Sequence, residues 1–217
     1  MGAGIAGLGF EKLVYGGLTK VFAGIVIAPI GGIIFGLLVT TLIITVFASR
    51  KPGPVNKTFG RLQIISSAWF ALTHGANDGQ KTMGIIVLIL FSAGLIPDLE
   101  MPLWVIFAAA TAMGLGTFFG GYKVIKTLGV KITKLKPYQG FAAETSGGLM
   151  LAVFAVFGIP ASTTHAITGT IMGSGAARRK RAVRWKVSRQ IVFSWLITIP
   201  GAAGLGIGFT YLINFFV

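Results

Sequence analysis

The chain has no cysteine, and only 5 of its 217 residues are acidic. Without cysteine it cannot form disulfide bonds or bind a metal through thiolates. Charged residues make up only 11% of the sequence, whereas soluble domains carry about a quarter. This scarcity of charge, together with 54% hydrophobic residues, excludes a soluble enzyme and predicts a membrane protein.

Long apolar segments recur through the whole chain. Four stretches contain no Asp, Glu, Lys or Arg, and they cover residues 21–49, 101–122, 145–177 and 190–217. A helix needs roughly 20 such residues to cross a bilayer. The first stretch is too long for the apolar core of a signal peptide, so we do not expect a cleaved leader. We expect an all-α, multi-pass protein of the cell membrane, in which residues 1–217 form a single membrane domain.

The basic residues are separated into groups along the chain. A net charge of +14 would suit a nucleic-acid-binding protein if these residues formed one patch. Instead they fill three loops between the apolar runs, at residues 50–61, 123–136 and 178–189. The positive-inside rule predicts that all three loops are cytoplasmic. We therefore expect membrane lipid, and no nucleic acid, as a partner.

The segment between the first two basic loops is too long for one straight membrane helix. Residues 62–96 must cross the membrane once, because residues 103–122 provide the return. As a single helix the segment would be about 50 Å long, against a hydrocarbon core of roughly 30 Å. Small and polar residues at 74–81 separate its two apolar arms. We expect the helix to be broken there.

Two short arms, at about 140–157 and 163–176, lie between the second and third basic loops. The residues between the arms are Gly158-Ile159-Pro160-Ala161-Ser162. The number of crossings here must be even. Because each arm is marginal for a full span, we expect a re-entrant helical hairpin whose tip lies inside the membrane. Two short spanning helices are the alternative. Non-helical backbone at that depth must be satisfied by protein or water, so both irregular segments should border one polar site.

Two acidic residues, Asp78 and Glu144, fall within apolar segments. An ionisable side chain in the membrane costs several kcal/mol unless it is paired or hydrated, so a functional role is the first expectation. Asp78 could instead form a simple ion pair with Lys81, three residues further along the helix. Glu144 lies about two helical turns from Lys136 and could instead reach the membrane interface.

The residues Ser162-Thr163-Thr164-His165 follow a proline and precede an apolar stretch, which predicts a helix start. Free backbone N–H groups, hydroxyls and the positive end of the helix dipole would converge there on an anion. Capping and helix packing alone are an alternative for these residues. In transporters, discontinuous helices bind anions at half-helix N-termini and cations through carboxylates and unwound carbonyls, which favours the functional interpretation.

At these motifs the sequence resembles the inorganic phosphate transporter (PiT) family. The matching segments are His74-Gly75-Ala76-Asn77-Asp78-Gly79-Gln80-Lys81-Thr82-Met83-Gly84 and Ser162-Thr163-Thr164-His165-Ala166. Residues 138–146 are also similar to the segment that opens the family's hairpin. The resemblance implies a symporter of inorganic phosphate, not an enzyme, that needs no cofactor and uses Na+ or H+ as the coupling ion.

The resemblance also implies roles for individual residues. Phosphate binding is implied for Ser162, Thr163, Thr164 and Thr82. Binding of the coupling cation is implied for Asn77, Asp78, Gln80 and Glu144, with Asp78 and Asn77 as the metal ligands if the ion is Na+. Lys81 could attract phosphate or neutralise Asp78. His74 and His165 could act as protonation switches, although packed histidines with a purely structural role are commoner.

Family members consist of two inverted halves, and this chain resembles only the C-terminal half. A fragment, the product of a split gene or a homodimer would each explain this. We expect the chain to join a complementary N-terminal half or a second copy of itself. An accessory membrane subunit without transport of its own is the alternative, and a channel is a third possibility, although the sequence shows no ring of charges or repeated filter segment.

Overall fold

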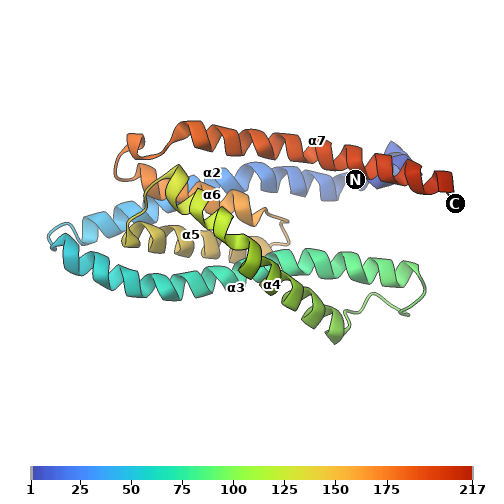
Figure 1. The fold of residues 1–217 in the computed structure, drawn as a ribbon, viewed down its shortest axis with the longest axis horizontal. Coiled ribbons are helices and arrows are strands. Elements are labelled where there is room, and N and C mark those ends of the chain that lie inside the picture. The colour runs from blue at the N-terminus through green and yellow to red at the C-terminus, as the bar shows by residue number, and fades with distance from the viewer. Residues whose placement is uncertain (1, 217) are drawn as a thin grey trace.

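The computed structural model describes residues 2–216, which form helices and loops with no strand among them (Figure 1). The α-helices are α1 (Gly2–Leu8), α2 (Tyr15–Val46), α3 (Pro52–Ser92), α4 (Leu103–Lys126), α5 (Pro137–Val156), α6 (Thr163–Ala176) and α7 (Trp185–Phe216). The short segments η1 (Phe10–Lys12) and η3 (Lys180–Ala182) are 3-10 helices, and η2 (Thr127–Ile132) is a π-helix. The expected all-α fold is confirmed.

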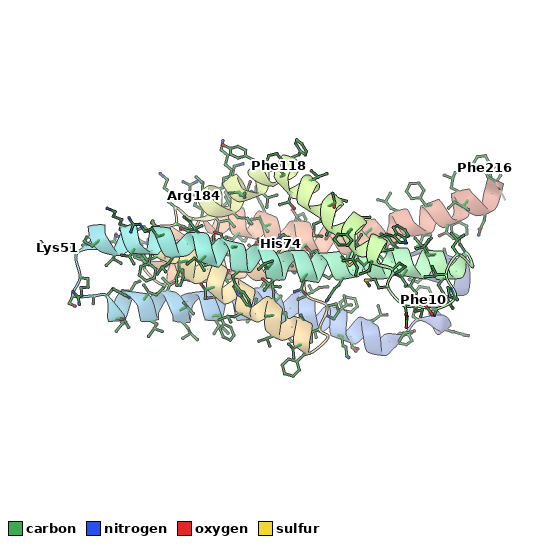
Figure 2. All side chains as sticks on the ribbon, turned by 90° about the horizontal axis from the view of Figure 1, so that it is seen from below. Phe10, Lys51, His74, Phe118, Arg184 and Phe216 are labelled. Carbon is green, nitrogen blue, oxygen red and sulfur yellow. The ribbon has the colours of Figure 1, made fainter. Side chains whose placement is uncertain are left out.

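Three helical segments are long and apolar enough to cross a membrane: Tyr15–Val46, Leu103–Tyr122 and Trp185–Phe216. Their mean hydropathies are 2.5, 1.7 and 1.7. Large apolar side chains cover the outside of these helices, and Phe118 and Phe216 point away from the other helices in Figure 2. Such a surface suits lipid better than water, as expected for a membrane protein.

The predicted break at residues 74–81 is wrong, because α3 continues without interruption through 41 residues. At 1.5 Å per residue this helix is about 60 Å long. Its polar residues are satisfied without unwinding: Asn77 donates to the carbonyl of Thr73 over 3.0 Å, and Lys81 pairs with Asp78 one turn away. The helix also begins at Pro52, so most of the first basic loop is helical.

Helices α5 and α6 run antiparallel and form the predicted hairpin (Figure 1). Residues 157–162 connect them, and Gly158 adopts a positive φ of 60° that favours glycine at this turn. The two helical arms are therefore confirmed, while the entry of the tip into the membrane stays a prediction. The tip lies about halfway along α3 (Figure 1).

Helix α2 holds α6 through a row of small residues. The buried residues along it recur at every fourth position and include Gly24, Ala28, Gly32, Gly36 and Thr40. A Cβ atom on Gly32 would lie 2.7 Å from the carbonyl oxygen of Ala166 in α6. The backbones of the two helices therefore touch, which is the arrangement that small residues permit in membrane helices. On its other side the hairpin packs through α5 against α3.

The three basic segments lie at one end of the molecule. In Figure 1 the connections at 47–51, 133–136 and 177–184 gather at the same end, and the connection at 93–102 lies at the opposite end. Figure 2 likewise shows Lys51 and Arg184 towards one end and Phe10 and Phe216 towards the other. This arrangement agrees with the expectation that the three basic loops lie on the same side of the membrane. That this side is the cytoplasmic one stays a prediction.

Candidate functional site

Asp78 lies at the centre of a polar cluster midway along α3. His74 Nε2 lies 3.0 Å from Oδ2 of Asp78, and Lys81 Nζ lies 3.1 Å from Oδ1. These residues stand four positions before and three positions after Asp78, so all three share one face of the helix. Thr163, at the start of α6, donates its hydroxyl to Oδ2 over 2.9 Å. The cluster therefore joins the two sequence motifs, and Figure 2 shows His74 near the middle of α3.

The predicted helix start at the hairpin tip is confirmed. Helix α6 begins at Thr163, and the hydroxyl of Ser162 accepts a hydrogen bond from the backbone N–H of His165 over 3.4 Å. The first N–H groups of any helix have no acceptor within the helix, and here they face the connection between α5 and α6. The Thr163 side chain is buried against α3, whereas the Thr164 side chain is exposed.

Two further hydrogen bonds tie the hairpin to the same part of α3. Lys81 Nζ donates to the carbonyl oxygen of Ala161 over 2.7 Å, and Asn77 Nδ2 donates to the carbonyl of Leu151 over 3.4 Å. Lys81 thus contacts both Asp78 and the backbone of the hairpin tip. The ion pair with Asp78, one of the two roles considered for this lysine, is present, and its side chain is 44% exposed.

Glu144 occupies a second polar cluster between α5 and α3. Its Oε2 accepts from Ser66 over 2.6 Å, and its Oε1 accepts from Ser67 over 2.9 Å and from Gln63 over 3.4 Å. Its carboxylate forms no ion pair with any described side chain, Lys136 included. The carboxylate is therefore held by three neutral donors.

Several expected site residues lie outside these two clusters. Thr82 donates its hydroxyl to the backbone of Asp78 over 3.3 Å, along its own helix. The Gln80 side chain is exposed and makes no hydrogen bond to the described part of the chain. His165 is buried and stacks on Trp195 of α7 with 3.8 Å between ring centroids, and its Nδ1 has no hydrogen-bond partner in residues 2–216.

The partners of Glu144 were not expected from the sequence. Gln63, Ser66 and Ser67 stand in an otherwise apolar arm of α3, and a glutamine followed by two adjacent serines within such an arm was the available signal. Their contribution depends on the packing of α5 against α3, which spacing along the chain does not reveal.

Comparisons with known proteins identify the family to which the chain belongs. The sequence model of the phosphate transporter family (PHO4) matches residues 47–206. The chain belongs to this family, which confirms the resemblance noted in the sequence.

Similar proteins include a probable low-affinity inorganic phosphate transporter of Rhizobium meliloti, 47% identical over 204 residues that cover 94% of this chain and 61% of the relative. A protein of the same name from Bacillus subtilis is 39% identical over 98% of this chain and 64% of the relative. The chain thus spans less than two thirds of the length of these curated relatives.

A solved structure titled "The sodium-dependent phosphate transporter" matches all of this chain and 72% of its own chain. The TM-score is 0.83 at 22% sequence identity. This likeness supports the helical fold. The dependence on sodium is a property of that protein.

Proposed function

We propose that this chain forms one half of a cation-coupled phosphate symporter and contributes one wall of its phosphate site. The observation that carries the proposal is the hydrogen bond of 2.9 Å from Thr163 to Asp78. This bond joins the N-terminus of α6, where an anion can bind, to the carboxylate of Asp78. These are the two kinds of chemistry that coupling of an anion to a cation requires.

Phosphate would bind at the start of α6. Ser162, Thr163 and Thr164 offer hydroxyls beside the first backbone N–H groups of the helix, where the helix dipole is positive. Thr82 lies on α3 one turn beyond Asp78, and its hydroxyl can turn from its own backbone to a ligand. Each hydrogen bond to a charged group contributes roughly 1.5 to 3 kcal/mol, so a few such donors suffice for binding.

The coupling cation has two candidate positions. Asp78 with Asn77 forms the first, and Asn77 uses its amide N–H groups for backbone carbonyls, so that its carbonyl oxygen can turn to a cation. Gln80 stands two positions after Asp78 on the unbroken helix and points away from it, so the structure does not favour its expected role. Glu144 with its hydroxyl neighbours forms the second. A carboxylate beside amide and hydroxyl oxygens can accept either Na+ or H+.

The position of the hairpin supports a re-entrant arrangement. The polar groups at its tip contact residues midway along α3, at Lys81 and Asp78. If α3 crosses the membrane, the tip therefore lies at membrane depth and depends on α3 to satisfy its backbone. An inverted half, supplied by another chain or by a second copy, would complete the site. The relatives, which are named phosphate transporters, are longer than this chain.

Uptake of radiolabelled phosphate into proteoliposomes tests the proposal. The full chain is reconstituted alone and together with a candidate first half, with and without an imposed Na+ or proton gradient. We expect saturable, gradient-dependent uptake only from the assembled form, either the two halves together or a dimer of this chain. Absence of uptake in every combination, with the chain co-purifying with an unrelated membrane protein, would instead support an accessory subunit.

A further inference from the structure

The carboxylates of Asp78 and Glu144 have different partners. Asp78 is paired with a cation of the same chain, since Lys81 Nζ lies 3.1 Å from its Oδ1. Among the described side chains, Glu144 contacts only neutral donors: two serine hydroxyls and one glutamine amide. The negative charge of Asp78 is therefore compensated internally, whereas that of Glu144 is not.

The ammonium group of Lys81 is surrounded by the kinds of oxygen atom that bind a metal cation. Besides Oδ1 of Asp78 it contacts the carbonyl oxygen of Ala161 over 2.7 Å. Ala161 lies in the non-helical connection between α5 and α6. A carboxylate oxygen and an unwound backbone carbonyl are the kinds of ligand that membrane transporters use for Na+. Lys81 supplies the positive charge to both oxygens through its own N–H groups.

We propose that Lys81 acts as a tethered cation that fills the cation place beside Asp78, so that this carboxylate binds no free Na+. Glu144 is then the position open to a coupling cation. The inference rests on the proposed function and deepens it, because it chooses between the two candidate positions.

Attachment to α3 gives the ammonium its advantage over a free ion. Lys81 stands three positions after Asp78 on the same helix face, so its ammonium is held beside the carboxylate at every Na+ concentration, whereas Na+ must displace it to bind. The other carboxylate oxygen is also engaged, by His74 and Thr163. Asp78 and Lys81 together thus hold the start of α6 against α3, and the resulting pair carries no net charge to attract a second cation.

Glu144 has the opposite properties. The hydroxyls of Ser66 and Ser67 donate hydrogen bonds to the carboxylate in this structure. Each hydroxyl can also rotate so that an oxygen lone pair faces a cation. A cation there would also neutralise the carboxylate, which no basic side chain that the structure describes does. The two clusters therefore differ in function: the Asp78 cluster contains the permanent cation of Lys81, and the Glu144 cluster can bind and release a cation from solution.

The thermal unfolding of the purified full chain in lipid nanodiscs tests this division, with Na+ replaced by choline at constant ionic strength. All measurements use the Glu144→Gln background, so that only the Asp78 position is probed. We expect no Na+-dependent rise in melting temperature in this background. Adding Lys81→Met should create one, and adding Asp78→Asn should remove it again. A vacated site with a dissociation constant of about 1 mM would favour the folded state about 100-fold at 100 mM Na+.

Lys57→Met is the matched control, because it removes the same charge from an exposed position near the start of α3. It should create no response to Na+. If Lys81→Met does not fold, Lys81→Gln keeps a polar side chain and serves in its place.

Two results would overturn the inference. One is an Asp78-dependent response to Na+ while Lys81 is present, and the other is a folded Lys81 variant that gains no response. The proposed function is tested separately by phosphate uptake of the assembled transporter. Absence of uptake would refute that function whatever the melting temperatures in Na+ and choline are. Melting temperatures that contradict the role of Lys81 would leave the proposal of phosphate transport unaffected.

Discussion

The hydroxyl of Ser66 in α3 donates a hydrogen bond to Oε2 of Glu144 in α5 over 2.6 Å. Ser66 is buried, and the bond fastens the first arm of the hairpin to α3. Together with Ser67 on the other carboxylate oxygen it holds a charge that has no basic partner in the described chain. Structural support and a candidate ion site therefore coincide at one side chain, and substitutions can separate the two roles.

Glu144→Gln keeps the size of the side chain and removes its charge. We expect phosphate uptake by the assembled transporter to lose its dependence on the coupling cation, while the chain still folds, because an amide can still hydrogen-bond to both serines. Uptake measured against the Na+ or proton gradient, together with a thermal melt, checks this. A Glu144→Gln transporter with the parent's cation dependence would contradict the assignment.

Ser66→Ala tests the structural role of the same contact. Loss of a hydrogen bond to a charged group costs roughly 1.5 to 3 kcal/mol, and the carboxylate would be left with fewer donors. We expect a lower melting temperature for this variant. Ser92→Ala is the control, because Ser92 is exposed near the end of α3 and its hydroxyl contacts only its own helix. Equal melting temperatures for the two variants would show that the contact with Glu144 adds no stability.

Thr163→Val removes one hydroxyl and retains the branched shape. If the Thr163 hydroxyl turns from Asp78 and donates its hydrogen bond to phosphate, affinity for phosphate should fall about ten-fold or more in this variant, since one hydrogen bond to a charged group is worth roughly 1.5 to 3 kcal/mol. Thr163→Ser, which keeps the hydroxyl, should recover most of the affinity. Phosphate binding to the assembled transporter is the measurement.

Thr198→Val serves as the control for Thr163, because Thr198 is exposed on α7 and its hydroxyl contacts the backbone of its own helix. It should leave phosphate affinity at the parent value. A Thr163→Val variant that melts earlier but binds phosphate as well as the parent would show that the hydroxyl only fastens the hairpin to α3.

Gly169→Ala tests the close packing of α2 against α6. A Cβ atom at Gly169 would overlap the backbone of Pro29, including its carbonyl oxygen, so the helices must move apart. Overpacking of this kind typically costs about 1 to 3 kcal/mol. Gly208→Ala on α7 meets no atom within 4 Å and should be neutral or slightly stabilising, because alanine favours a helix. Equal thermal melts of the two variants would contradict the backbone contact.

Much of the hairpin could be predicted from local sequence. The start of α6 at Thr163 follows from a proline, a capping serine and an apolar stretch, and its length follows from the basic residues after Ala177. The ion pair of Asp78 with Lys81 follows from their spacing on a helix. These features need no knowledge of distant parts of the chain.

The rest depends on packing. A polar and glycine-containing stretch suggested a break in α3, but Asn77 and Lys81 find acceptors in the hairpin and along the helix, so the backbone stays helical. In the same way, Ser66 and Glu144 are 78 positions apart in the sequence and come into contact only because α5 packs against α3. Contacts at that separation come from the tertiary structure.

The gathering of basic loops at one end of the molecule predicts their exposure on the same side of the membrane (Figure 1). Since the chain has no cysteine, single cysteines can be introduced and labelled without background. Lys57→Cys and Lys186→Cys should react with an impermeant thiol reagent in inside-out vesicles and stay unlabelled in intact cells, as the positive-inside rule requires. Leu99→Cys, in the exposed connection at the opposite end, should react from outside. Labelling of Lys57→Cys and Lys186→Cys from opposite sides would contradict the topology, because α3, α4, the hairpin and the start of α7 would then need a different number of crossings.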